Sequence, residues 1–189
     1  MSANDRPAAP LVSVIVPCFN YASYVGDALR SILEQDYSAI ELIVIDDGST
    51  DDSALRIEEA LSGWRSYPAV QRVEFIRQSN QGVSAALNRG LDLAHGEFVA
   101  TFDADDVMVP GRIALQADYL VAHPEVGCLG GRAVRIDQNG AVLPKKTKAR
   151  EVRCYDFAQA LAQALVVGGN LVMYRREAML AAGKYDPQL

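Results

Sequence analysis

Carboxylates follow two apolar runs of the sequence at short spacing. Asp47 comes just after the run 40–45, and Asp103 and Asp105 flank a single residue at the end of the run 97–102. Two carboxylates held this close repel each other, and a divalent cation relieves that repulsion. Hard oxygen ligands suit Mg²⁺ or Mn²⁺, which complete their coordination with water and phosphate oxygens. The pattern therefore predicts a metal site for a phosphate-bearing ligand.

The polar residues near these carboxylates can be interpreted either as ligand contacts or as local turns and helix caps. The carboxylate of Asp47 can accept hydrogen bonds from the base or the ribose of a nucleotide lying across a sheet edge. Residues 49–52 are typical of turns and helix caps, so we expect them mainly to cap a helix that runs through Leu61. Asp106 is either a further member of the acidic cluster or the cap of a helix that enters at Pro110.

Amides and glycines stand near a second predicted helix. Asn80 and Gly82 lie in a turn before the helical pattern that starts at Val83, and Asn88 lies farther along it. Amide side chains there could hold ribose or sugar hydroxyls, and a helix N-terminus favours anions. Asn and Gly are also common in ordinary loops. The stretch 168–170, Gly-Gly-Asn, is either a close approach for substrate or a plain turn.

The hydrophobic pattern supplies the elements that must position these residues. Short runs rich in Val, Ile and Phe predict buried, parallel strands. They are 11–16, 40–45, 73–76, 97–102 and 126–129. Amphipathic helices are predicted between them, among them 25–33 and 83–94. Alternating strands and helices predict an α/β fold, a three-layer α/β/α sandwich with a mostly parallel central sheet. In such sheets ligands bind beyond the carboxyl ends of the strands.

Composition and charge exclude several classes of protein. The chain has 189 residues, 50% of them hydrophobic, which suits one globular domain from residue 11 after a flexible lead-in at 1–10. The net charge of −6 argues against a general nucleic-acid binder. Cys18, Cys128 and Cys154 have neither disulfide nor zinc spacing, which favours a reducing, cytoplasmic setting. No apolar stretch approaches the ~20 residues that span a bilayer, so any membrane contact would be peripheral.

Three further features receive local interpretations. Lys145 to Arg153 form a basic cluster, which we interpret as a solvated loop, with contact to an anionic acceptor or lipid headgroup as the alternative. His95 and His123 are predicted to cap the C-terminal ends of helices. Cys18 is predicted to be a small packing residue rather than a nucleophile.

Five segments, in this order, resemble the motifs of the family 2 glycosyltransferases, which have the GT-A fold. They are VSVIVPCFN at 12–20, VIDDGSTD at 44–51, NQGVSAALNRG at 80–90, FDADD at 102–106 and Gly-Lys-Tyr-Asp at 183–186. The resemblance covers nearly the whole chain. It implies a GT-A sandwich with a Rossmann-like nucleotide-binding half.

The resemblance also implies roles for individual residues. Those that it places around a nucleotide-sugar donor, with a UDP-sugar favoured, are Pro17, Phe19, Asn20, Tyr21, Asp47, Asn80, Gly82, Asn88 and Asp103. Asp105 would coordinate the Mn²⁺ or Mg²⁺ that bridges the diphosphate and assists departure of the nucleoside diphosphate. The family typically inverts the anomeric centre, with a carboxylate deprotonating the acceptor hydroxyl.

The acceptor side is expected to be incomplete. In the family, the acidic segment that supplies the base follows shortly after the stretch matching 183–186, and this sequence ends at Leu189. We therefore expect residues 11–189 to be a domain truncated on its acceptor side, which binds donor and transfers sugar poorly. The expected partner is a glycan or lipid-linked acceptor of cell-surface polysaccharide synthesis, met in the cytoplasm or at the inner face of the membrane.

Two other classes compete with this interpretation. The run 99–107 also resembles the first motif of haloacid-dehalogenase-type phosphatases, in which Asp103 would be the nucleophile and Asp105 its neighbour. That family needs a downstream acidic metal motif, and no pair of aspartates follows Asp106. The third class is a non-catalytic module that binds nucleotide-sugars. Phosphoester hydrolysis would favour the phosphatase, and donor binding without transfer would favour the module.

Overall fold

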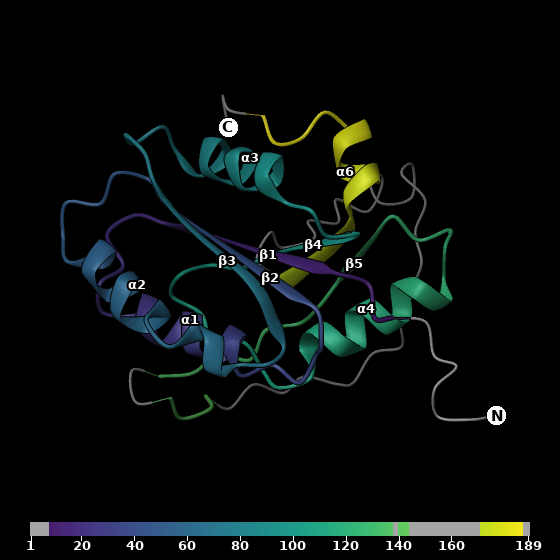
Figure 1. Cartoon of the computed structure of the whole chain (residues 1–189), viewed down its shortest axis with the longest axis horizontal. Helices are drawn as coiled ribbons and strands as arrows, with labels where there is room; N and C mark the ends of the chain where they lie inside the picture. Colours follow the sequence, from purple (N-terminus) through teal and green to yellow (C-terminus); the bar gives the residue numbers. More distant parts are fainter. Residues whose placement is uncertain (1–7, 138–139, 144–170, 187–189) are drawn as a thin grey trace.

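The protein, described here from a computed structural model, is built on one mostly parallel sheet. The structure describes residues 8–137, 140–143 and 171–186. Within these ranges the sheet has six strands in the order β3-β2-β1-β4-β6-β5 (Figure 1). They are β1 (Val12–Cys18), β2 (Ile40–Asp46), β3 (Val70–Arg77), β4 (Phe98–Thr101), β5 (Cys128–Gly130) and β6 (Val172–Arg175). The first four pair in parallel, and β6 is antiparallel to both β4 and β5.

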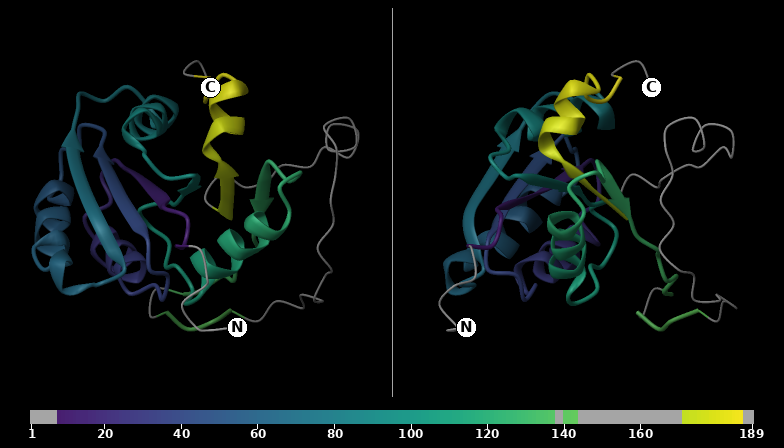
Figure 2. Two further views of the ribbon diagram at one scale, coloured as in Figure 1. Left: turned by 45° about the vertical axis from the view of Figure 1, so that its right-hand side comes forward. Right: turned by 90° about the vertical axis from the view of Figure 1, so that its right-hand side faces the viewer.

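Helices cover both faces of the sheet, which confirms the predicted α/β/α sandwich. They are α1 (Val25–Leu33), α2 (Ser53–Leu61), α3 (Val83–Leu93), α4 (Arg112–Ala122) and α6 (Arg176–Ala181), with a short 3₁₀ helix at Trp64–Ser66. α1, α2 and α4 lie on one face, and α3 and α6 lie on the other (Figures 1 and 2). None of the helices in the described ranges is long and apolar enough to cross a membrane.

Alternating side chains of the strands fill two separate cores. On β1, Val14 packs into the core under α1, α2 and α4, whereas Ile15 packs into the core under α3. Helix α3 approaches β1 closely because residue 90 is glycine. A Cβ at Gly90 would stand 2.4 Å from Cγ2 of Ile15, closer than any real contact. The sheet and α3 are therefore fixed against each other near the site described below.

The last predicted strand differs from the prediction. The run 126–129 was expected to be a buried parallel strand, but β5 covers Cys128–Gly130, is largely exposed and runs antiparallel to β6. The reason is that β6 occupies the place beside β4, so that β5 has a strand on one side only. β3, at the opposite edge, is likewise half-buried rather than covered on both faces.

Candidate functional site

The carboxyl ends of the parallel strands bring four predicted loops to one edge of the sheet. Cys18 at the end of β1 is in register with Asp46 at the end of β2, and Thr101 ends β4 opposite Ile15 of β1. The loops that follow β1, β2, β3 and β4 therefore start side by side. Cys18 itself is buried, and burial raises the pKa of its thiol to about 11, as expected of a packing residue.

The loop after β1 is joined to the loop after β2 by hydrogen bonds. Asn20 adopts a left-handed backbone with φ of 60°, and its Oδ1 accepts the backbone N–H of Thr50 at 2.8 Å. The backbone N–H of Asn20 donates to Oγ of Ser49 at 3.0 Å, and that of Tyr21 donates to Oγ of Ser53 at 2.8 Å. Asn20, predicted to bind the donor, thus connects the loop after β1 to the loop after β2.

The N-cap of α2 is Asp52, whose side chain makes no capping hydrogen bond, and the carboxylate at the start of the helix comes from Asp51. Asp51 accepts the backbone N–H groups of Ser53, which begins α2, and of Ala22. Burial would raise the pKa of Asp51, but the hydrogen bonds from the hydroxyl and the backbone N–H of Ser53 and from the backbone N–H of Ala22 outweigh it and lower the pKa. Asp106 is not a helix cap, because α4 begins only at Arg112 and its N-cap is Gly111 in a left-handed conformation.

Asp47 holds the loop that leads into α3. The residue is 3% exposed, and its carboxylate accepts three hydrogen bonds from that loop. Oδ1 accepts Nε2 of Gln78 at 2.8 Å and the backbone N–H of Gln81 at 3.0 Å, and Oδ2 accepts the backbone N–H of Gly82 at 2.8 Å. Sequence reasoning missed both glutamines, since no local signal links them to a residue about thirty positions earlier.

Glycine is required where these two loops meet. Gly48 has a φ of 78°, and a Cβ there would stand 2.7 Å from the backbone nitrogen of Asn80. Beside it, Asp46 is fully buried between the backbone N–H of Ser49 and the side chain of Arg77, at 2.9 and 2.8 Å. Asp46 is thus a structural residue, while Asn80 and Gly82 lie exposed at the surface of the edge.

The acidic turn after β4 presents two aspartates to solvent. Phe102 and Ala104 are buried, whereas Asp103 and Asp105 are exposed, so the alternation of the strand continues into the turn. The pKa of Tyr21 is raised, mainly by the charge of Asp105, then by burial and by Asp103. The phenol from the loop after β1 therefore lies near the acidic turn.

Exposed aromatic rings stand in the loop after β1. Phe19 is 43% and Tyr21 36% exposed, and the ring of Tyr21 meets that of Tyr24 edge-on with centroids 6.5 Å apart. Flat exposed rings beside carboxylates can stack on a base or a sugar. The edge thus joins an aromatic surface, the loop held by Asp47 and the acidic turn.

The acidic turn fits a cation whose remaining ligands come from a substrate. Among the described residues, no group of three or more His, Cys, Asp and Glu side chains is arranged to hold a metal alone. Mg²⁺ and Mn²⁺ are commonly held by one or two carboxylates together with phosphate oxygens and water. Asp103 and Asp105 supply such oxygen ligands at an exposed position. Their fit is therefore to a metal that arrives with a phosphate-bearing ligand.

Asn88 has partners inside the protein. Its Nδ2 donates to the backbone oxygen of Tyr185 at 2.8 Å, and its Oδ1 accepts the backbone N–H of Tyr185 at 2.9 Å. The amide therefore joins α3 to the chain after α6. Two sets of predicted residues, 168–170 and Lys145 to Arg153, lie outside the described residues.

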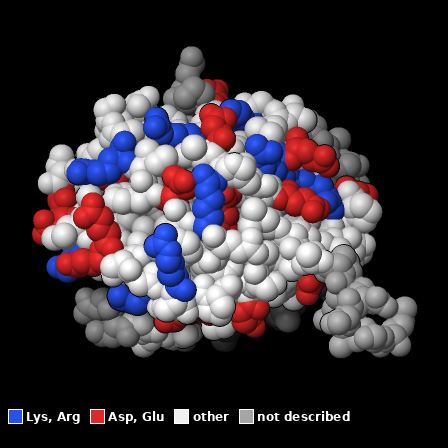
Figure 3. Space-filling model, in the orientation of Figure 1, with Lys and Arg blue, Asp and Glu red and all other residues white. Residues whose placement is uncertain are grey.

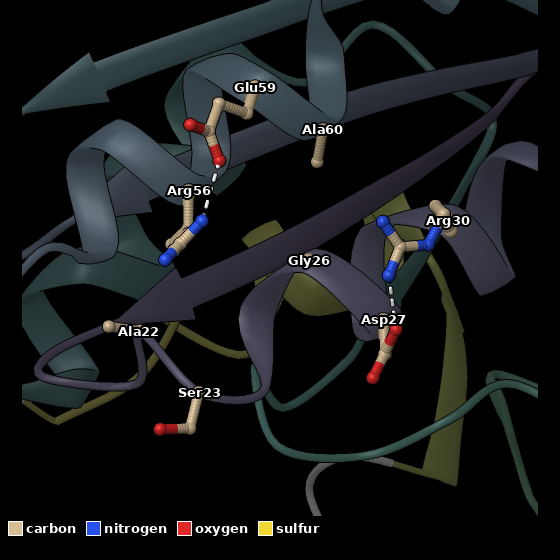
Figure 4. Close-up of a pocket in the computed structure, with 8 residues that line it drawn as sticks. All are labelled: Ala22, Ser23, Gly26, Asp27, Arg30, Arg56, Glu59 and Ala60. Atoms are coloured by element: carbon tan, nitrogen blue, oxygen red, sulfur yellow. Dashed lines mark hydrogen bonds and ion pairs between the residues drawn. The ribbon is translucent and has the colours of Figure 1, made fainter.

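Two hollows are lined by other residues of the described part of the chain. One, of about 360 Å³, lies between α1 and α2, where the ion pairs Arg30–Asp27 and Arg56–Glu59 flank a floor of small residues (Figure 4). The other, of about 570 Å³, is largely apolar and lies between α4 and β5. None of the predicted donor-binding residues lines either one. Acidic and basic side chains are mixed over the face seen in Figure 3.

Fold and edge together define a class of protein. A mostly parallel sheet with helices on both faces is the fold of the GT-A glycosyltransferases among the structural neighbours of this chain. The sequence profile of glycosyl transferase family 2 matches residues 13–180. The chain therefore belongs to glycosyltransferase family 2.

Individual relatives agree with this assignment. An uncharacterized glycosyltransferase of Nostoc is 32% identical over 93% of this chain and 54% of its own length. The putative teichuronic acid biosynthesis glycosyltransferase TuaG of Bacillus subtilis is 30% identical over 89% of this chain and 63% of its own length. The structure of S. aureus TarS 1–349 with UDP-GlcNAc has a TM-score of 0.67 and 25% identity, covering 93% of this chain and 48% of that one. The chain thus spans about half the length of these relatives.

Proposed function

We propose that this chain binds the nucleotide-sugar donor of an inverting glycosyltransferase, with a UDP-sugar favoured and with help from Mg²⁺ or Mn²⁺. The observation that carries the proposal is the meeting, at one sheet edge, of the loop held by Asp47 and the exposed acidic turn of Asp103 and Asp105. Such an edge offers backbone amides and aromatic rings to a nucleoside and carboxylates to a metal diphosphate. Family membership supports the same reaction class.

Each part of the edge has a distinct task in this proposal. Phe19 and Tyr21 offer exposed rings against which the base stacks. Asp47 fixes the loop that ends at Gly82, so the turn before α3 is preorganised to face the nucleoside. Asp103 faces the ribose or sugar, and Asp105 holds the cation. A bound divalent cation supplies positive charge that stabilises the departing diphosphate.

The names and bound ligands of the relatives support a proposal for the acceptor and the donor. TuaG is named for teichuronic acid biosynthesis, and an Escherichia coli relative that is 31% identical over 71% of this chain is named chondroitin synthase. TarS has been solved with UDP-GlcNAc. We therefore propose a uridine nucleotide as donor carrier and a hydroxyl of a cell-surface glycan or its lipid-linked precursor as acceptor, with transfer in the cytoplasm or at the inner membrane face. No catalytic base is assigned among the described residues.

A nucleotide panel tests the proposal. Calorimetric titrations with UDP, GDP, CDP and ADP in Mn²⁺ should give the tightest binding for UDP. Binding of none of the four would contradict the proposed function. Hydrolysis of a generic phosphoester would support the alternative hypothesis of a haloacid-dehalogenase-type phosphatase. None of these relatives supports that hypothesis. Donor binding without sugar transfer to any glycan acceptor, in the full-length protein, would support the non-catalytic module.

A further inference from the structure

The chain that follows the acidic turn is fastened to the C-terminal end of helix α1 by side-chain hydrogen bonds. Oγ of Ser31 accepts the backbone N–H of Met108 at 2.9 Å, and the same hydroxyl donates to the backbone oxygen of Ala28 at 2.7 Å. Nε2 of Gln35 donates to the backbone oxygen of Val109 at 3.1 Å. These contacts join residues that are 77 and 74 positions apart in the sequence. We call Ser31 and Gln35 the α1 anchor.

Gln35 acts through the donor end of its side chain. The residue is 4% exposed, and Nε2 donates to two backbone oxygens, those of Ser31 and Val109, each at 3.1 Å. Among the described residues, Oε1 of the same amide is buried and has no hydrogen-bond partner. A buried acceptor without a partner costs free energy that an apolar side chain of similar size would avoid. The contribution of the amide is therefore the pair of bonds from Nε2, one of which fixes Val109.

The start of the acidic turn is held by the sheet. The backbone N–H of Phe102 donates to the oxygen of Ile15 in β1 at 3.0 Å. Phe102 and Ala104 are both buried in the core that lies under α1. Within the turn, the backbone N–H of Asp106 donates to the oxygen of Asp103 at 3.3 Å. The backbone at the start of the turn is thus fixed before any ligand binds.

The α1 anchor supplies the second fixed point, at the far end of the turn. Met108 is 3% exposed, and its side chain belongs to the same core as Ile32 of α1. Its backbone N–H has Ser31 as its acceptor, so both the side chain and the backbone of Met108 are held against the helix. The exposed aspartates lie between this point and Phe102. A short segment fixed at both ends has few conformations left to lose when a ligand binds.

We propose that the α1 anchor positions the acidic turn for the metal diphosphate, so that Asp103 and Asp105 are ordered before the ligand arrives. This inference rests on the proposed function, because it assumes that the acidic turn binds a metal diphosphate. Ser31 and Gln35 are positioning residues, since their bonds go to the backbone that follows the turn. Loss of the anchor frees the far end of the turn and leaves the loop held by Asp47 unchanged. The anchor therefore governs the metal-dependent part of binding and not the metal-independent part.

Affinity for UDP, measured with Mn²⁺ and with chelator, separates the two parts. Gln35→Met removes both donors of the amide and keeps an unbranched side chain of similar size. We expect this variant to weaken binding in Mn²⁺ about three- to tenfold, the scale of ordering one or two loop residues on binding, and to leave binding in chelator unchanged. Equal losses in Mn²⁺ and in chelator, or no loss in Mn²⁺, would overturn the proposal.

Gln71→Met is the matched control. Nε2 of Gln71 also donates to a backbone oxygen, that of Ser38 at 3.3 Å, but this bond lies where β2 and β3 begin, at the amino edge of the sheet. The same substitution there should change neither affinity. A loss in Mn²⁺ as large as that of Gln35→Met would show that any such bond affects binding, and the proposal would fail.

Two substitutions of Ser31 test the inference by rescue. Ser31→Ala leaves the backbone N–H of Met108 without its acceptor and should weaken binding in Mn²⁺ alone. Ser31→Thr keeps a hydroxyl that can bond to an earlier carbonyl of the helix, as the serine does, and should restore the wild-type affinity. This pair decides the question by itself if Gln35→Met does not fold. Binding by Ser31→Thr as weak as that by Ser31→Ala would contradict the inference.

Hydrogen exchange tests the anchor without any ligand. In Ser31→Ala and in Gln35→Met the amides of residues 103–109 should exchange faster than in wild type, and in Gln71→Met they should not. If wild type fails to bind UDP and exchange still rises in this way, the proposed function has failed and the anchor stands. If exchange is unchanged in both anchor variants, the anchor itself is refuted.

Discussion

The two edges of the central sheet both carry acidic side chains, and they use them in opposite ways. At the amino edge, Glu41 of β2 is fully buried, and the protein surrounds it with hydrogen-bond donors. Ser13 Oγ donates to it at 2.5 Å, the backbone N–H of His95 at 2.8 Å and Nη1 of Arg72 at 2.6 Å. Burial would raise the pKa of Glu41, but these bonds outweigh burial and lower the pKa.

At the carboxyl edge the acidic turn is exposed. Asp103 and Asp105 stand outside the core, and Asp105 is the main charge acting on the phenol of Tyr21. Asp47 is intermediate, since it is buried like Glu41 but its donors come from a surface loop. The comparison teaches that charge alone does not mark function. Glu41, which is surrounded by hydrogen-bond donors, stabilises the fold. Asp103 and Asp105, which are exposed to solvent, are suited to binding a ligand.

The largest expected effect is the loss of Glu41. Glu41→Ala leaves the buried hydroxyl of Ser13 without its acceptor and removes one of the two carboxylates that pair with Arg72, the other being Glu74, which should cost about 3 kcal/mol of the free energy of unfolding. Urea denaturation measures this loss. Binding of UDP by the folded fraction should be unchanged, because the amino edge is far from the donor loops. A loss below about 1 kcal/mol would mean that the hydrogen bonds of Glu41 contribute little to the stability of this edge.

The pH dependence of stability tests the same residue in wild type. Because the pKa of Glu41 is lowered on folding from its ordinary value of 4.5, its contribution is present above pH 4.5 and is lost as the pH falls through the folded pKa. The stability difference between wild type and Glu41→Ala should therefore shrink in acid. A difference that stays constant to pH 3 would refute this assignment.

An intermediate effect is expected for Asp47. Asp47→Ala should weaken UDP binding by about 1–3 kcal/mol, because the loop from Gln78 to Gly82 loses its acceptor. Calorimetry on the folded variant measures the change in affinity. Retention of wild-type affinity would remove Asp47 and its loop from the site.

The smallest effect is expected for Asp51, which lies beside the site and accepts the backbone N–H of Ser53, the first residue of α2. Asp51→Ala should lower the free energy of unfolding by about 1 kcal/mol, the usual value of a helix cap. Thermal unfolding measures this change. Affinity for UDP should stay at the wild-type value, and a larger fall than that of Asp47→Ala would reverse the ranking.

The sequence allowed the sheet, the acidic turn and the order of the loops to be predicted, because strand periodicity and the residues that follow each strand are local signals. β5 was predicted wrongly as a strand covered on both faces, because its place at the sheet edge depends on β6, which pairs antiparallel with both β4 and β5 and lies far along the chain. His95, predicted to be a helix cap, instead binds Glu41, fifty-four positions away. His123 is the C-cap of α4, as predicted.

The partners of site residues were the least predictable feature. Asn88 was expected to face the donor, and its bond to Tyr185 spans ninety-seven positions. Asp47 was predicted as a donor contact from its place after β2, but nothing in the pattern showed that Gln81 and Gly82 would bind it first. Pairings of this kind are set by how close the folded loops come, and a single sequence records no such distance.

The central claim is that the exposed acidic turn binds the metal diphosphate of the donor. Its most direct test is a titration of UDP with Mn²⁺ and with chelator, for wild type and for Asp105→Asn. Wild type should bind UDP at least about tenfold more tightly with Mn²⁺, the scale of one charged contact, and the variant should bind equally weakly in both conditions with unchanged stability. Equal wild-type affinity in Mn²⁺ and in chelator would contradict the account.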